Sequence, residues 1–179
     1  MKKLFLLFIL IPITNCFSQE QERWMLNSES SVIKYEAKHL LHKWEGINEK
    51  IKGVFLSKNN GGKIAIAANI SDFDTGISNR DSNTLRVLNA LEYPQVKFYS
   101  DKILISENVI SFEGELDFHG VKIKKNIEAN YFIKNSSINI EGNFPIQLTD
   151  FDIKLPSLML VKMDDIANIK YKLIFEMNK

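Results

Sequence analysis

Apolar and polar residues alternate along most of the chain, the pattern of β-strands that bury one face. The clearest run places Ile169, Tyr171 and Leu173 on one face and lysines between them. Comparable runs cover residues 31–38, 64–70, 96–105, 110–118, 121–133 and 138–144. About eight strands at this short and regular spacing predict a β-sandwich or a closed β-barrel, and periodicity alone does not choose between the two.

One segment has a helical period instead. Between Asn79 and Leu91, leucines recur every three residues, and Asn79 or Asp81 could cap the start of a helix. Pro94 ends the segment, because the residue before a proline is pushed out of the helical region. We therefore predict one short helix at residues 79–91.

Two further segments depart from the alternation. Residues 39–45 could form a second short helical turn. Residues 148–165 contain Pro156 and an apolar stretch, which predicts either a strand pair or a loop folded over a barrel mouth.

The first 18 residues have the layout of a secretory signal peptide. Lys2 and Lys3 precede an apolar run of about ten residues, which is too short to span a bilayer. Cleavage after Ser18 would leave one domain, residues 19–179, in a periplasmic or secreted protein. The alternatives are a permanent N-terminal anchor or lipidation of Cys16, the only cysteine.

Cleavage would also change the charge balance. It removes two of the 23 basic residues and leaves 21 against 22 acidic residues, dispersed along 161 residues. A near-neutral, mixed surface lacks the basic patch that nucleic acids require, so we expect no nucleic-acid partner. The mature chain would have no disulfide, so its apolar core must suffice for stability.

Several short motifs, in order, resemble those of the YceI-like family. They are Trp24, Ser30-Ser31-Val32, Lys38-His39, Gly53-Val54-Phe55, Asp74-Thr75-Gly76, Asn79-Arg80-Asp81, Tyr93-Pro94-Gln95-Val96-Lys97-Phe98-Tyr99-Ser100, Gly114-Glu115-Leu116 and Gly120-Val121. Together they cover nearly the whole mature chain. His42, Trp44 and His119 depart from the family pattern, and residues 148–165 match it loosely.

This resemblance implies an all-β fold, an eight-stranded antiparallel lipocalin-like barrel. It also implies export to the periplasm and a long apolar ligand, such as an isoprenoid or quinone-like lipid, inside the barrel. A barrel of this size has room for one small ligand.

Eight aromatic residues fall on the buried faces of the predicted strands. They are Tyr35, Phe98, Phe112, Phe118, Tyr131, Phe144, Tyr171 and Phe175. They could line a ligand cavity, which the family resemblance favours. Alternatively they fill a dry core, as in many small barrels, and the protein acts through its surface as an interaction module.

Polar candidates are fewer. Arg80 could bind a phosphate or other head group, or it could pair with Asp72, Asp74 or Asp81 beside the helix cap. His39 and His119 could likewise lie near a head group at the barrel rim.

The three histidines also define a second hypothesis. His39, His42 and His119 could together bind Zn²⁺ in a metal-dependent protein, or they could simply bond to backbone and solvent at the rim.

Catalytic motifs are not visible in the sequence. There is no G-x-S-x-G elbow and no glycine-rich phosphate loop, and the paired carboxylates lie in turn-like contexts. We therefore expect a binding protein rather than an enzyme, with no resident metal and no cofactor.

Overall fold

The structure, a computed structural model, describes residues 22–40, 42–58, 61–134, 136–158 and 160–177. The predicted signal peptide at residues 1–18, including Cys16, lies outside the described residues. In chain order the elements are β1 (Glu22–Leu26), η1 (Ser28–Ser30), β2 (Val32–His39), β3 (His42–Asn48), β4 (Lys52–Lys58), β5 (Gly61–Asn69), η2 (Ile70–Asp72), α1 (Ser78–Val87), β6 (Gln95–Ser106), β7 (Val109–Phe118), β8 (Val121–Lys134), β9 (Ser137–Gln147), η3 (Leu148–Phe151), β10 (Ser157–Leu158), β11 (Val161–Lys162) and β12 (Ile166–Met177), where η marks a 3-10 helix.

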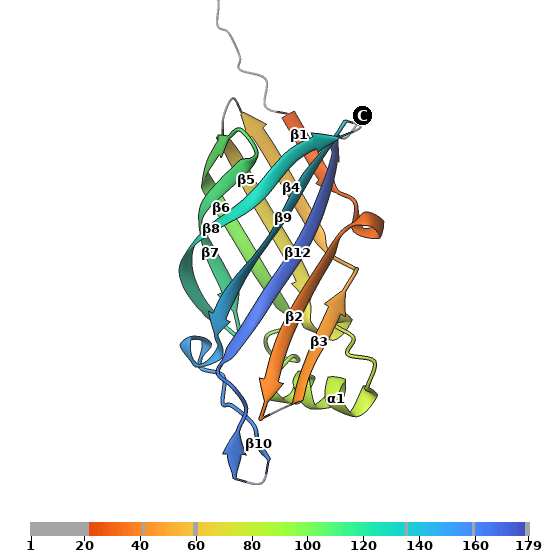
Figure 1. Ribbon diagram of the computed structural model, residues 1–179, viewed down its shortest axis with the longest axis vertical. Helices are drawn as coiled ribbons and strands as arrows, with labels where there is room; N and C mark the ends of the chain where they lie inside the picture. The colour runs from red at the N-terminus through yellow and green to blue at the C-terminus, as the bar shows by residue number, and fades with distance from the viewer. Residues whose placement is uncertain (1–21, 41, 59–60, 135, 159, 178–179) are drawn as a thin grey trace, which may run out of the picture.

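Within the described residues, eight antiparallel strands close into a barrel (Figure 1). Their order is β1-β4-β5-β6-β7-β8-β9-β12, and β12 pairs back with β1. Closure leaves no free edge along this ring, which protects apolar strands from aggregation. The predicted eight-stranded antiparallel barrel is confirmed, and the alternative of a sandwich is wrong.

The first wall of the barrel is a broken strand. β1 and β2 both pair with β12, at its upper and lower ends in Figure 1, and η1 interrupts them. The Asn27 side chain stabilises this break by accepting a hydrogen bond from the Ser30 N–H at 3.2 Å. After the break, β2 pairs with β3, and β3 ends the sheet without pairing to a further described strand.

The α1 segment lies beside β3 at the lower end of the barrel (Figure 1). A bridge joins Ile47 of β3 to Asp74, which precedes α1 in the chain, and both N–O distances are 2.9 Å. No helix among the described residues is long and apolar enough to cross a membrane.

The predicted helix at residues 79–91 is present but shorter. It ends at Val87, and Asn89, with a φ of 45°, starts a turn that leads to β6. The predicted caps are wrong: Ile77 occupies the N-cap position without a side-chain bond. Asp81 instead accepts hydrogen bonds from the Thr75 N–H at 3.1 Å and the Thr75 hydroxyl at 2.6 Å.

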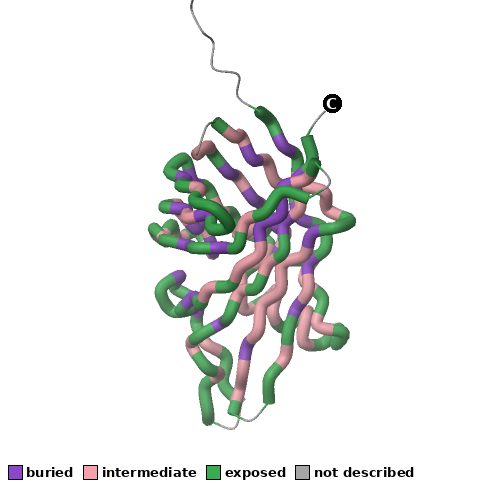
Figure 2. The backbone as a smooth tube through the Cα atoms, turned by 45° about the horizontal axis from the view of Figure 1, so that its top comes forward, coloured by how far each residue is buried: buried purple, intermediate pink, exposed green. Residues whose placement is uncertain are grey.

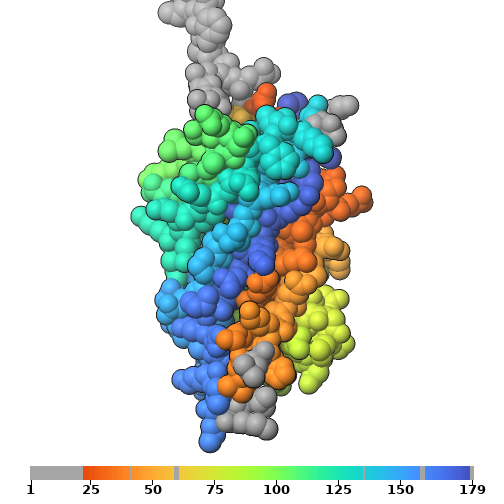
Figure 3. All heavy atoms as spheres, viewed as in Figure 1, coloured from red at the N-terminus to blue at the C-terminus, as the bar shows by residue number. Residues whose placement is uncertain are grey.

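The helical turn expected at residues 39–45 is also wrong. β2 and β3 form a tight hairpin there, in which His39 lies opposite His42 across the turn. A spacing of three residues fits a turn as well as a helix, and the alternation on both sides decides for strands. Residues 148–165 form η3 and then the short β10–β11 hairpin, which projects beyond the lower rim (Figures 1 and 3).

Candidate ligand-binding cavity

The interior of the barrel is filled at one end and open at the other. Phe55, Ile110 and Phe175 are fully buried at the upper end, where the buried residues gather in Figure 2. Farther down, inward-facing side chains such as Ile33 and Phe144 are only half-buried, because they border empty space rather than other side chains.

This space is a cavity of about 810 Å³. Its lining is mostly apolar and includes Ile33, Tyr35, Ala37, Ile64, Ile66, Ala68, Phe98, Phe112, Leu116, Phe118, Ile127, Ile140, Phe144, Ile146, Ile169, Tyr171 and Leu173. The volume lies in the range of pockets that enclose small-molecule ligands. The interaction-module alternative required a core filled throughout, and the cavity shows that the core is not filled throughout.

Six of the eight predicted aromatic residues line this cavity, and two do not. The six are Tyr35, Phe98, Phe112, Phe118, Phe144 and Tyr171. Phe175 instead packs against Phe55 at the filled end, with ring centroids 6.1 Å apart. Tyr131 packs against the same core cluster. Both share the inward face with the other six but lie too far along the barrel axis.

The two tyrosines of the lining differ in their polar surroundings. The Tyr171 hydroxyl is buried without a hydrogen-bond partner among the described residues, and burial raises its pKa to about 12. Burial also raises the pKa of Tyr35, although hydrogen bonding to Thr84 and Trp44 opposes that shift. The middle of the cavity therefore strongly disfavours charge.

Polar residues of the lining gather at the lower boundary of the cavity. His39 and His42 from the β2–β3 hairpin, Arg80 and Asn83 from α1, and Ser157 from β10 lie there. Several of these residues are exposed, so the cavity opens to solvent at this end. An elongated ligand could thus place an apolar chain inside the barrel and a polar group at the opening.

Arg80 has a partner that the sequence did not reveal. Its guanidinium carbon lies 5.3 Å from the centroid of the Trp44 ring, which is a cation–π contact. It forms no ion pair with a described carboxylate, contrary to the predicted pairing with Asp72, Asp74 or Asp81. A planar cation held over an aromatic face at a cavity opening is available to a ligand.

Three further α1 residues of the lining, Asn83, Thr84 and Val87, were not predicted from the sequence. They follow Arg80 by three, four and seven residues, so they share its helix face. The sequence shows this helical spacing, but the leucines of the same segment have a helical spacing too and indicated a different buried face.

The structure does not assemble the predicted histidine site. His39 donates through Nε2 to the Val161 carbonyl at 2.9 Å, whereas His119 donates through Nδ1 to the Phe151 carbonyl at 2.8 Å. His119 also lies outside the cavity lining. No group of three metal-binding side chains occurs among the described residues. The three-histidine hypothesis is therefore not supported, and His119 instead joins the β7–β8 turn to η3.

This architecture, an antiparallel barrel with one filled end and an apolar cavity open at the other, is that of lipocalin-type proteins. The sequence is matched over residues 24–175 by the model of the YceI-like domain, and the chain belongs to that family. No match was found among the curated proteins.

Solved structures share the fold at low identity. Burkholderia cenocepacia BcnA is 18% identical, with a TM-score of 0.76 over 83% of this chain and 98% of that one. A polyisoprenoid binding domain from Saccharophagus degradans is 12% identical, with a TM-score of 0.70 over 87% of this chain and 98% of that one. A Campylobacter jejuni YceI protein is 19% identical, with a TM-score of 0.66 over 79% of this chain and 90% of that one.

Proposed function

We propose that this protein binds one isoprenoid-type lipid inside the barrel, as a carrier or a sequestering protein rather than an enzyme. The observation that carries the proposal is the cavity of about 810 Å³ with its apolar lining. In this proposal the protein acts in the periplasm or outside the cell after removal of residues 1–18. Anchoring through Cys16 is the alternative.

The physical basis is the hydrophobic effect. Each CH₂ group moved from water into an apolar site contributes about 0.8 kcal/mol, so a long prenyl chain binds tightly without specific polar contacts. The deep lining residues, such as Ile64, Ile127 and Leu173, offer only hydrocarbon, and they could neither activate a substrate nor stabilise charge. That composition suits retention of an intact lipid and not its chemical conversion.

The polar groups at the opening would contact the head group. Arg80, lying over Trp44, offers a cation to an acidic or strongly polar head group. His39 and His42 also line the cavity near its opening. His119 has no part in this proposal, because its ring is engaged with Phe151 and Tyr93 away from the cavity.

The structural neighbours add support of a general kind. The Saccharophagus degradans domain with the same fold is described as polyisoprenoid binding. At 12% identity that likeness extends to the fold alone, so the ligand of this chain must be tested on its own residues.

A cavity-filling substitution tests the proposal. Ile33 lines the cavity and lies opposite Tyr171 in the β2–β12 pair, so Ile33→Trp would occupy lumen volume without opening the wall. Leu104→Trp adds the same indole on the outer face of β6, where Leu104 is 74% exposed. A long-chain polyprenyl alcohol should co-elute with the wild type and with Leu104→Trp, and not with Ile33→Trp. Equal retention by folded Ile33→Trp would overturn the cavity as the site.

A further inference from the structure

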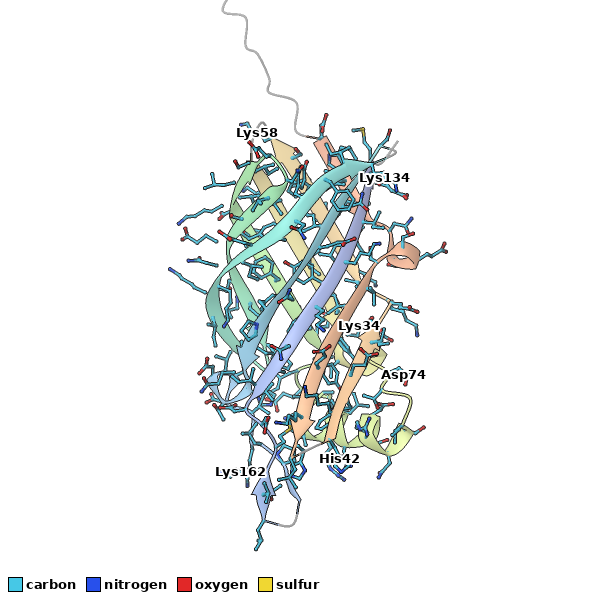
Figure 4. All side chains as sticks on the ribbon, viewed as in Figure 1. Lys34, His42, Lys58, Asp74, Lys134 and Lys162 are labelled. Atoms are coloured by element: carbon cyan, nitrogen blue, oxygen red, sulfur yellow. The ribbon has the colours of Figure 1, made fainter. Side chains whose placement is uncertain are left out.

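The β2–β3 turn and the β10–β11 hairpin are joined into one projection at the open end of the barrel. The Asp164 N–H donates to the Lys38 carbonyl at 2.9 Å, and His39 Nε2 lies 2.9 Å from the Val161 carbonyl. We call this projection the rim tip, meaning the described residues among 38–43 and 154–164. His42 and Lys162, one from each hairpin, both lie at the end of the molecule where the β10–β11 hairpin projects (Figure 4).

Two leucines of the rim tip have backbone conformations that leucine disfavours. Leu40 has a φ of 54° and Leu160 a φ of 67°. Glycine and asparagine adopt this left-handed region at lower cost, and bulky residues rarely do. The other described non-glycine residues with positive φ are all polar: Asn89, Glu107, His119, Ser136 and Asp152.

Packing within the described chain leaves Leu160 wholly uncovered and covers only about half of Leu40. Leu160 is 100% exposed and Leu40 is 49% exposed. Two apolar side chains are thus held outward at turns where polar residues are the rule. Backbone strain of this kind is a ground for inferring function, and it indicates a contact with something outside the chain.

The charge around these leucines indicates what that partner is. The rim tip carries Lys38, Lys43, Lys154 and Lys162 against a single carboxylate, Asp164. Lys38 pairs with Asp164 at 3.6 Å, and the other three lysines form no ion pair with a described residue. Exposed leucines flanked by lysines suit an anionic lipid surface, in which apolar side chains insert and long basic side chains reach the head groups.

The rim tip also borders the opening of the cavity. His39 and His42 line the cavity from one hairpin, and Pro156, Ser157 and Met163 line it from the base of the other. We propose that the rim tip docks on an anionic phospholipid bilayer, with Leu40 and Leu160 inserted among the lipids. Docking in this orientation places the cavity opening against the membrane, so an apolar ligand would pass between the two without crossing water.

Vesicle binding of the full chain, expressed with its own leader and purified after export, tests this surface. The variants are Leu40→Asn and Leu160→Asn, because asparagine favours the left-handed conformation and the fold is retained. Leu104→Asn, at an exposed leucine on the outer wall, is the matched control. Leu40 and Leu160 do not line the cavity, so failure of vesicle binding in these variants leaves the lipid-retention experiment unaffected.

Vesicles of phosphatidylcholine with phosphatidylglycerol should bind the wild type and Leu104→Asn alike. Each rim-tip variant should bind about tenfold more weakly, the loss expected when one leucine is no longer inserted. Replacing Lys43, Lys154 and Lys162 by glutamine should abolish the preference over pure phosphatidylcholine. Equal binding by all variants, or equal losses in the rim-tip variants and Leu104→Asn, would overturn the proposal.

A positional measurement completes the test even if an N-terminal anchor holds every variant on the vesicles. Leu160→Trp should show a blue shift of tryptophan emission on vesicle addition, and Leu104→Trp should not. A shift at position 104 alone, or at neither position, contradicts docking through the rim tip. Docking on lipid is also contradicted if a partner protein shields position 160 from water in the absence of lipid and vesicles do not.

Discussion

Tyr171 lies over Gly142, its partner across the β9–β12 pair, so closely that a Cβ at position 142 would be 2.5 Å from the phenol oxygen. Tyr35 covers Gly46 in the same way, also as a cross-strand pair. In both pairs the missing glycine side chain lets the ring lie against the barrel wall. Two large side chains therefore face inward without crossing the lumen, and space for a ligand remains.

Gly142→Ala should destabilise the protein and reduce its lipid capacity. The new methyl group would meet the Tyr171 oxygen at 2.5 Å and Cζ at 2.8 Å, which forces the ring away from the wall and into the cavity. Overpacking of this kind costs about 1–3 kcal/mol. Denaturant unfolding measures the stability, and co-elution with a polyprenyl alcohol measures the capacity.

A double-mutant cycle provides the control for that prediction. In a Tyr171→Leu background the ring is absent, so Gly142→Ala should cost clearly less free energy of unfolding. An equal cost in both backgrounds would show that Gly142 is required for backbone reasons and not by the ring.

Tyr171→Phe should leave stability unchanged near neutral pH or raise it by about 1 kcal/mol. The hydroxyl has no partner among the described residues, and a buried polar group without a partner costs free energy that phenylalanine does not. Urea unfolding of both proteins without ligand decides this. A loss of more than about 1 kcal/mol would reveal a hydrogen bond that the hydroxyl makes in solution.

The same residue predicts a pH dependence in alkaline solution. The pKa of Tyr171 is about 12 in the folded protein, against 10.0 for an ordinary tyrosine. The unfolded chain therefore loses this proton first, and the free energy of unfolding decreases as the pH rises from about 10 to 12, by up to about 2–3 kcal/mol. This part of the decrease should be absent in Tyr171→Phe. Identical alkaline profiles for the two proteins would contradict the burial of the hydroxyl.

Arg80→Gln should distinguish head groups. If the guanidinium over Trp44 meets an anionic head group, the variant should bind a polyprenyl phosphate about tenfold more weakly and a polyprenyl alcohol unchanged. Arg23→Gln, at an exposed site on β1, is the charge-matched control and should change neither affinity. An equal loss of affinity for both lipids would show that Arg80 maintains the structure of the opening and does not bind the head group.

His119→Asn should destabilise the fold by about 1–2 kcal/mol. It removes the bond to the Phe151 carbonyl and the ring contact with Tyr93, whose centroid lies 4.9 Å away, while asparagine tolerates the φ of 53°. His42→Asn, at an exposed site, should stay within about 0.5 kcal/mol. Added Zn²⁺ should not shift the melting temperature of the wild type. A shift that disappears in His119→Asn would restore the metal hypothesis.

The sequence predicted the inward face of the strands well, because alternation reports directly which side chains point inward. It did not predict where along the barrel axis each inward-facing side chain lies. Tyr131 and Phe175 share the inward face with Tyr171. Register places Phe175 opposite Ile138, which is outside the cavity lining, and Tyr131 opposite Ile140, the last β9 residue of the lining toward the filled end. Strand register arises from pairing between distant segments, and no local pattern contains it.

Turns and polar contacts were predicted least well, for a related reason. The β2–β3 turn depends on Leu40 in a conformation that leucine rarely adopts, so its sequence carries no turn signal. Three carboxylates lie near Arg80 in the sequence, but in the structure its guanidinium contacts the Trp44 ring. That contact exists only because the broken wall brings β3 beside α1.

Native mass spectrometry of the protein purified from its own host, followed by organic extraction, tests lipid binding most directly. We predict one lipid with a long prenyl chain per protein, released by the solvent and absent from Ile33→Trp prepared in the same way. A wild-type protein of the mass of the polypeptide alone, with nothing in the extract, would contradict the proposal. The same spectrum reports the N-terminal mass, which distinguishes cleavage after Ser18 from lipidation at Cys16.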